Sequence, residues 1–264
     1  MSPSLPLLVA QLSDLHLFST PEQTLLGLQT MASFSAIVEA LVQLPQQPDV
    51  ILLTGDLAQD ESPAAYEQIV QQLRPLNIPT YWLPGNHDHL PSMASILNQA
   101  PIYSEKAFSM GGWQFLLLDS TVSQQVHGAF SAKYLAELDQ YLQSTTQPTL
   151  IALHHPPVAI DSDWLDNLGL HNSEDFFAVV ERYPHVKLTI FGHIHQQVEQ
   201  QRQGIAYLST PSTCVQFAPN QKTFSLDQSQ PGFRLLQLYP DGTFESEVQR
   251  VRINEQIDLA AQGY

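Results

Sequence analysis

The segments LLVAQLSDLH (residues 7–16) and VILLTGD (residues 50–56) decide the fold of this chain. Each begins with a run of apolar residues that has the length of a buried β-strand, and each ends on polar residues. Between the two segments, apolar residues from Met31 to Leu44 recur at the spacing of a helix. The order strand, helix, strand is typical of parallel strands joined by a crossover helix.

The same alternation continues along the chain. It predicts strands over residues 80–83, 149–153 and 187–191, a hairpin over 107–118, helices over 66–73, 131–142 and 173–183, and a strand-rich part from about residue 205. Residues 156–172 and 217–231 fit neither period, and we expect long loops of the kind that form lids. We therefore expect an α/β fold with mixed β-sheets packed as a sandwich flanked by helices, in a single domain over residues 1–264.

Composition limits the functions that the chain can have. With 264 residues, 43% hydrophobic and 14% charged, it can build a sizeable core. Its net charge of −16 disfavours a nucleic-acid partner, because phosphate contact requires a basic face. No apolar run approaches the ~20 residues that span a bilayer, which argues against a membrane role. The stretch Met1–Ala10 lacks the features of a secretory signal, and the single cysteine favours a reducing cytoplasm.

Chemically active side chains follow five of the predicted strands, at the point where each strand ends. They are Asp14, His16, Asp56, Asn86, His87, His154, His193 and His195. The carboxyl ends of parallel strands form the ligand crevice of an open α/β sheet, so we expect these side chains to meet. Apart from His87, they offer two carboxylates, one amide oxygen and four imidazoles, a mixture that suits first-row metal ions rather than calcium. These are too many ligands for one ion and fit two ions about 3.5–4 Å apart.

The same five blocks, in the same order, resemble the signature of the calcineurin-like metallophosphoesterases. Within that superfamily the chain is similar to the class III cyclic-nucleotide phosphodiesterases in LSDLHLF (residues 12–18), DWLD (163–166) and TPSTCVQF (210–217). The resemblance implies the αββα fold of that superfamily and two metal ions per chain, iron or manganese, with other divalent ions as alternatives. It implies one ion held by Asp14, His16 and His195, a second held by Asn86, His154 and His193, and Asp56 as the bridging ligand.

The resemblance further implies a metal-dependent phosphodiesterase that converts 3′,5′-cyclic AMP, and other cyclic nucleotides as an open alternative, to the 5′-monophosphate. The two metal ions would lower the pKa of a bridging water to about 7, and the resulting hydroxide would attack phosphorus. His87 is the expected catalytic residue, stabilising charge or protonating the leaving 3′-oxygen, with Asp88 fixing its tautomer. The substrate-binding candidates are His16, Asn86, His87, His195 and Trp164, the last of which we consider for stacking on the base.

Other readings of the same residues stay open. The five blocks build only a phosphate site, so a related enzyme acting on 2′,3′-cyclic nucleotides, nucleotide pyrophosphates or phosphomonoesters is an alternative. A non-catalytic scaffold of the same fold is another, and a homodimer is a further open alternative. Either His155 orients a metal ligand or it only packs in the core. We expect Cys214 to be a small buried hydrophobic residue. The role of His171 is open.

Overall fold

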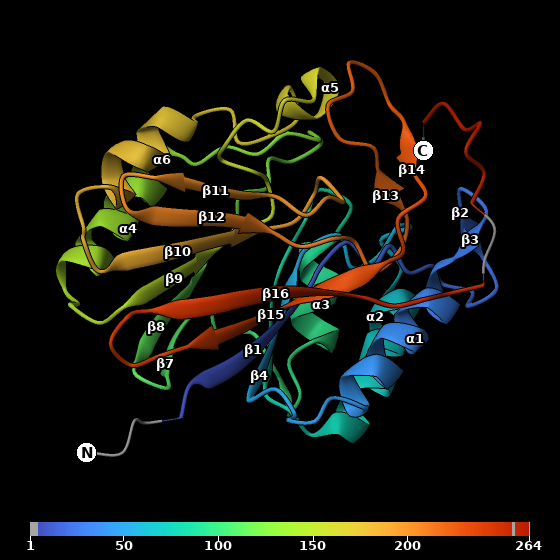
Figure 1. Cartoon of the computed structure of the whole chain (residues 1–264), viewed down its shortest axis with the longest axis horizontal. Coiled ribbons are helices and arrows are strands. Elements are labelled where there is room, and N and C mark those ends of the chain that lie inside the picture. Colours follow the sequence, from blue (N-terminus) through green and yellow to red (C-terminus); the bar gives the residue numbers. More distant parts are fainter. Residues whose placement is uncertain (1–4, 255–256, 264) are drawn as a thin grey trace.

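Two six-stranded β-sheets form the centre of the molecule (Figure 1). The computed structural model describes residues 5–254 and 257–263, so the first four residues of the stretch Met1–Ala10 lie outside the described part. The strand order is β16-β15-β1-β4-β5-β6 in the first sheet and β11-β12-β10-β9-β8-β7 in the second. The expected α/β sandwich of mixed sheets is confirmed.

The first sheet combines parallel and antiparallel pairs. β1 pairs in parallel with β4, β4 with β5 and β5 with β6, whereas β15 runs antiparallel to both β1 and β16. Its strands are β1 (Leu7–Leu12), β4 (Val50–Thr54), β5 (Thr80–Leu83), β6 (Ile102–Tyr103), β15 (Gly232–Leu238) and β16 (Phe244–Arg250). The strand at the start of the described chain therefore lies between an early strand and a late one.

The second sheet has a parallel centre and antiparallel edges. β8, β9, β10 and β12 run parallel, and β7 and β11 close the two edges in the opposite direction. Its strands are β7 (Ala107–Met110), β8 (Trp113–Leu117), β9 (Thr149–Ala152), β10 (Val186–Phe191), β11 (Glu199–Arg202) and β12 (Ile205–Ser209). Side chains such as Val9 and Leu52 from the first sheet and Phe115 and Leu150 from the second share one buried cluster, which is the core between the sheets.

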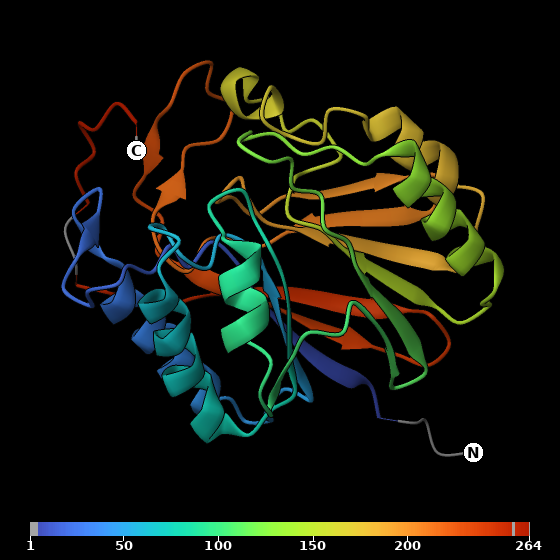
Figure 2. The ribbon, with the colours of Figure 1, turned by 180° about the vertical axis from the view of Figure 1, so that it is seen from behind.

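Helices cover the outer face of each sheet, as Figure 2 shows from behind. The helices are α1 (Thr30–Val42), α2 (Pro63–Leu73) and α3 (Leu90–Ile96) on the first sheet, and α4 (Ala132–Gln143) and α6 (Ser173–Val180) on the second. The Ser62 and Ser131 side chains cap α2 and α4 by accepting a hydrogen bond from a backbone N–H in the first turn. Among the described residues, no helix combines the length and the apolar character needed to cross a bilayer.

Several short elements were not predicted. They are β2 (Thr24–Leu25), β3 (Leu28–Gln29), the 3-10 turn Arg74–Leu76, α3, β6, β11, α5 (Asp163–Asp166), β13 (Gln216–Phe217) and β14 (Leu226–Asp227). Strands of two residues are too short to show a period, and β11 reads EQQR with every residue exposed. The segments expected as long loops are largely irregular, although they contain α5 and β14.

Two polar side chains join the sheets through the core. The Arg234 guanidinium of β15 is fully buried and donates to the Ser209 carbonyl of β12 at 2.7 and 3.0 Å, and it pairs with Glu199 of β11 at 2.8 Å. The Gln11 side chain of β1 donates to the Phe191 carbonyl of β10 at 3.0 Å. These bonds join the two sheets at the edge where β1, β10 and β12 end.

Candidate metal centre

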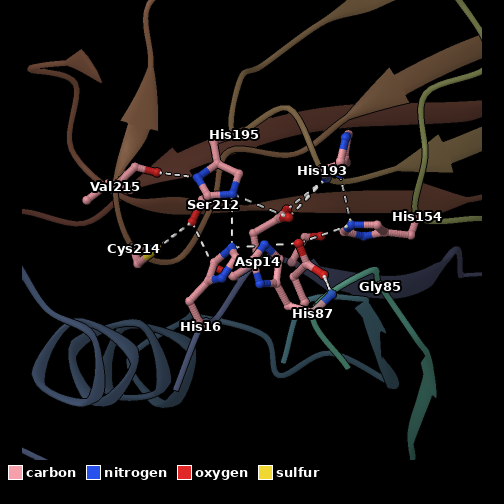
Figure 3. Close-up of polar contacts among 12 residues, drawn as sticks. Asp14, His16, Gly85, His87, His154, His193, His195, Ser212, Cys214 and Val215 are labelled. Atoms are coloured by element: carbon pink, nitrogen blue, oxygen red, sulfur yellow. Dashed lines mark hydrogen bonds and ion pairs between the residues drawn. The ribbon is translucent and has the colours of Figure 1, made fainter. Parts of the chain in front are cut away.

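The residues predicted as ligands gather where the central strands of both sheets end (Figure 3). Asp14 and His16 follow β1, Asp56 follows β4, and Asn86 and His87 follow β5. From the second sheet, His154 follows β9, and His193 and His195 follow β10. The structure brings six of the predicted side chains together, those of Asp14, His16, Asp56, His154, His193 and His195. The contact of Asn86 with this cluster and all individual roles stay predictions.

Five of these residues have left-handed backbone conformations. The φ angles are 55° for Asp14, 48° for His16, 51° for Asp56, 70° for His193 and 49° for His195. A residue with a Cβ loses about 1–2 kcal/mol in this region, so tertiary contacts must hold each one there. Such strain concentrates at functional sites, and here it falls on the predicted ligands.

Glycines let the loops approach closely. A Cβ on Gly192 would collide with the Ser13 side chain and lie 2.8 Å from Asp14 Oδ2. A Cβ on Gly85 would collide with Asp56 in the same way. The sequence therefore needs glycine at both positions for the loops from different strands to bring their side chains together.

The donor atoms form two halves that meet at Asp56. In one half, His195 Nε2 lies 3.1 Å from His16 Nε2 and 3.5 Å from Asp14 Oδ1. In the other half, His154 Nε2 lies 3.2 Å from His193 Nδ1. Asp56 Oδ2 lies 3.8 Å from His16 Nε2 and 3.2 Å from His154 Nε2, so it reaches both halves.

The outer nitrogens of His154 and His195 are held by the protein. Nδ1 of His154 donates to the Thr54 carbonyl and Nδ1 of His195 to the Val215 carbonyl, each at 2.8 Å. A carbonyl only accepts, so these bonds place a proton on Nδ1 and make Nε2 the nitrogen that faces the cluster. This is the tautomer that a metal ligand requires.

Burial and charge act against each other in the cluster. Burial lowers the pKa of His154, but the carboxylates of Asp56 and Asp14 outweigh it and raise the pKa to about 9. Burial lowers the pKa of His16 to about 3 despite the nearby Asp56. Burial raises the pKa of Asp56, yet His154 and His87 hold it well below its usual value. The two carboxylates are thus anionic at neutral pH, which favours cations in the cluster.

The donor set fits two metal ions. The Asn86 Oδ1 atom is buried and has no hydrogen-bond partner among the described residues, a condition that a cation would relieve. Donor atoms of Asp14, Asp56 and His154 lie within 4.8 Å of one another. Ring nitrogens of the imidazoles face one another at 3.1 Å between His16 and His195 and at 3.2 Å between His154 and His193. Two cations would satisfy the mixed oxygen and nitrogen set.

His87 lies at the margin of the cluster. Its ring is half-buried and packs edge-on against the His16 ring at 5.1 Å, and its backbone N–H donates to Asp56 Oδ1 at 2.9 Å. The neighbouring Asp88 carboxylate accepts the backbone N–H groups of Gly85, Leu57 and Ala58. Asp88 therefore ties the loop after β4 to the loop after β5, a role that its sequence position did not indicate.

The remaining candidates lie around the cluster. Trp164 packs against Phe217 at 5.1 Å, and Phe217 stacks on the His195 ring at 4.2 Å. His155 is buried with both ring nitrogens engaged, by Ser120 Oγ at 2.8 Å and by the Val126 carbonyl at 3.0 Å. His155 thus supports the site without a nitrogen left for a metal, and stacking of Trp164 on a base stays a prediction.

His171 and Cys214, whose roles were open, have different surroundings. His171 is exposed and stacks on His127 at 3.6 Å. Cys214 is buried beside the cluster. Two residues that hold ligands had no sequence signal for this role: Gln59, which bonds His16 Nδ1, and Ser212, which donates to the Asp14 carbonyl at 2.7 Å.

Two features define the class of the protein. They are the sandwich of two mixed sheets and the cluster of carboxylates and imidazoles whose two halves meet at Asp56. A family model described as calcineurin-like phosphoesterase matches residues 7–197. This chain belongs to the calcineurin-like phosphoesterase family, as the five sequence blocks predicted.

Individual relatives resemble the chain over nearly all of its length. It is 46% identical to the 3′,5′-cyclic-nucleotide phosphodiesterase alr5338 of Nostoc sp., covering 95% of both chains. It is 41% identical to the 3′,5′-cyclic adenosine monophosphate phosphodiesterase CpdA of Escherichia coli, covering 97% of this chain and 94% of that one. Among solved structures, a dimetal phosphatase from Danio rerio has the same fold, with a TM-score of 0.73, 16% identity and coverage of 98% of this chain and 100% of that chain.

Proposed function

We propose that this protein is a metal-dependent phosphodiesterase that hydrolyses 3′,5′-cyclic AMP, and related cyclic nucleotides, to the 5′-monophosphate. The observation that carries the proposal is the cluster in which Asp56 Oδ2 reaches imidazoles of both halves, at 3.8 and 3.2 Å. The names of the relatives at 41% and 46% identity support the choice of substrate.

The two halves of the cluster support the ligand roles that the family resemblance implies. Asp14, His16 and His195 would hold one cation, Asn86, His154 and His193 would hold the other, and Asp56 would serve both. When bound, the cations polarise the phosphate and supply an activated water at neutral pH. Iron and manganese are the proposed metals, because a mixture of imidazole and carboxylate suits first-row ions.

His87 is the proposed catalytic residue. It lies beside Asp56 and His16 yet is half-buried, so its ring can reach a bound phosphate from the open side of the cluster. There it donates a proton to the leaving 3′-oxygen or stabilises the charge that develops on it. His16, Asn86 and His195 contact the phosphate from the metal side, and Trp164 contributes to the wall of the nucleotide site.

The negative net charge is compatible with an anionic substrate. Two divalent cations bring four positive charges to a site with the two carboxylates of Asp14 and Asp56, whereas surface charges are screened beyond about 8–10 Å. The net charge of −16 disfavours long nucleic acids as substrates. We also propose that residues 1–264 act as one domain, and that the protein works in a reducing compartment such as the cytoplasm.

A substrate panel tests the proposal. Purified protein is treated with a chelator, reloaded with Mn²⁺, Fe²⁺ or Ca²⁺, and assayed on cyclic AMP, cyclic GMP, a 2′,3′-cyclic nucleotide, a nucleotide pyrophosphate and aryl phosphomonoesters and phosphodiesters. We expect cyclic AMP to give 5′-AMP, activity to vanish with the chelator, and manganese or iron to restore it better than calcium. If a 2′,3′-cyclic nucleotide, a pyrophosphate or a monoester is hydrolysed faster than cyclic AMP, that compound class becomes the proposed substrate. Absence of hydrolysis with two metals bound would indicate a scaffold.

A further inference from the structure

A tyrosine of helix α2 reaches the loop that carries His87. Tyr66 is fully buried, and its hydroxyl donates to Asp88 Oδ1 at 3.1 Å and accepts the backbone N–H of His89 at 2.8 Å. Asp88 and His89 are the two residues that follow His87. Burial, and then the Asp88 carboxylate, raise the pKa of Tyr66, so the hydroxyl keeps its proton and donates it to Asp88. One side chain of a helix thus holds both residues that follow His87.

The Tyr66 ring is fixed by the core between α2 and the first sheet. Tyr66, Ile69 and Leu73 recur at the spacing of one helix face, and all three are fully buried in the same hydrophobic cluster. The Ser62 side chain accepts the backbone N–H of Ala65 at 3.2 Å and so stabilises the first turn of the helix, directly before Tyr66. The hydroxyl is therefore presented to its two partners by a rigid element.

The Asp88 carboxylate connects this support to the loops around the cluster. Its Oδ1 atom accepts the backbone N–H of Ala58 at 3.1 Å, and its Oδ2 atom accepts that of Gly85 at 2.9 Å. The backbone N–H of His87 donates to Asp56 Oδ1 at 2.9 Å. These bonds all fix main-chain atoms, so they determine the point from which the His87 ring projects. Tyr66 completes them from the helix layer.

We propose that Tyr66 is a positioning residue that directs His87 towards the leaving oxygen of the substrate. The inference rests on the proposed function, because it requires His87 to act on that oxygen. Without the hydroxyl, Asp88 loses a donor and the His89 N–H loses its acceptor, so the main chain on one side of His87 can shift. A general acid must lie within hydrogen-bond reach of the atom that it protonates, and a small shift therefore slows the reaction.

The variant Tyr66→Phe tests the proposal, because it removes the hydroxyl and keeps the ring. We expect kcat on cyclic AMP to fall roughly 10- to 100-fold, since a misplacement of about 1 Å can cost about 100-fold. The KM and the two bound metals should stay as in the wild type. The kcat on a nitrophenyl phosphodiester should change little, because its leaving group is a weak base that gains little from a proton donor. A purely structural defect would slow both esters.

A double-mutant cycle shows whether Tyr66 acts through His87. We expect Tyr66→Phe to cause no further loss of kcat in the His87→Ala protein, because residues that act together are not additive. Tyr207→Phe is the matched control. Tyr207 is also fully buried, but its hydroxyl has no hydrogen-bond partner among the residues that the structure describes. This variant should keep the kcat of the wild type on both esters.

Several outcomes would overturn the proposal. Tyr66→Phe could keep the kcat of the wild type, slow both esters equally, or slow the His87→Ala protein by the same factor as the wild type. Loss of the fold or of metal in Tyr66→Phe would show that the hydroxyl stabilises the structure rather than the position of His87. A wild type that binds two metals and does not hydrolyse cyclic AMP contradicts the proposed function, whereas hydrolysis that Tyr66→Phe does not slow contradicts only the role of Tyr66.

Discussion

At the scale of single residues, His87 differs from the predicted imidazole ligands because it is half-buried, whereas His16, His154, His193 and His195 are buried. We expect His87→Ala to lower kcat on cyclic AMP by roughly 100-fold or more while two metals stay bound, because a general acid is lost and the ligand set is kept. Steady-state kinetics and metal analysis on the same preparation check this. His89→Ala, at an exposed neighbour, is the control. Loss of metal in proportion to activity would instead make His87 part of the metal site.

His155 makes the metal-free protein sensitive to acid. Burial, and then the charge of His154, lower its pKa to about 3. In the unfolded chain the pKa is about 6.5, so the unfolded state binds more protons between these values, and stability is complete above pH 6.5 and falls below it. We expect this residue alone to cost roughly 2 kcal/mol between pH 7 and pH 5. Denaturant unfolding of wild type and His155→Gln at both pH values measures the difference. If the free energy of unfolding falls equally in wild type and in His155→Gln between pH 7 and pH 5, His155 is not the source of the acid sensitivity.

The chemistry of the site could be predicted residue by residue, since carboxylates, imidazoles and one amide follow apolar runs. Their conformations could not. The left-handed φ angles of Asp14 and His195 arise from contacts between loops of different strands, which no local pattern encodes. Supports such as Ser212 and Gln59 carry no distinctive chemistry in the sequence, and only their position beside a ligand shows their role.

At the scale of elements, β12 and β15 are joined by the buried guanidinium of Arg234. We expect Arg234→Ala to lower the free energy of unfolding by about 2–4 kcal/mol, because a cavity forms and the Ser209 carbonyl loses two donors. Glu199→Gln is the control and should cost less than about 1 kcal/mol, because Glu199 is 51% exposed. Urea unfolding of both variants measures the contrast. If both variants lose the same free energy of unfolding, the ion pair of Arg234 with Glu199 stabilises the fold, rather than the hydrogen bonds of Arg234 to the Ser209 carbonyl.

The short helix α5 carries Trp164 against the aromatic residues behind His195. Trp164 packs on Phe217 at 5.1 Å and on Phe224 at 5.4 Å. Each such pair contributes about 0.5–1.5 kcal/mol, so we expect Trp164→Ala to raise the KM for cyclic AMP roughly tenfold. Trp164→Phe keeps the packing and should stay near wild type. If Trp164→Phe raises the KM as much as Trp164→Ala does, the indole N–H rather than the aromatic packing determines the KM.

The long strands were predictable as elements, and the short ones were not. β1, β4 and β5 begin and end where the apolar runs do, because β1 and β4 are buried along their whole length and β5 is buried except at Tyr81. β11 pairs with β12 through its backbone while all its side chains stay exposed, so no alternation marks it. The antiparallel addition of β15 to β1 is a long-range pairing that periodicity cannot specify.

At the scale of the whole molecule, the proposed cations bridge loops from both sheets and should stabilise the fold. Each ion present at 100 times its Kd adds about 2.7 kcal/mol. We therefore expect chelation to lower the Tm by roughly 10 °C for two ions and a chain of this size. Thermal unfolding with a chelator, and after addition of excess manganese or calcium, measures the shift. Manganese should restore the Tm better than calcium. An unchanged Tm after metal removal would contradict a centre that joins the two sheets.

The position of β1 between β4 and β15 has a consequence for how the protein matures. A ribosome delivers β4 soon after β1 but β15 much later, so β1 keeps one unpaired edge until β15 is made. The loop that carries Asp14 also lacks Ser212 until then. Nascent chains therefore present an incomplete centre, and metal loading becomes a post-translational event that waits for the last strands to dock.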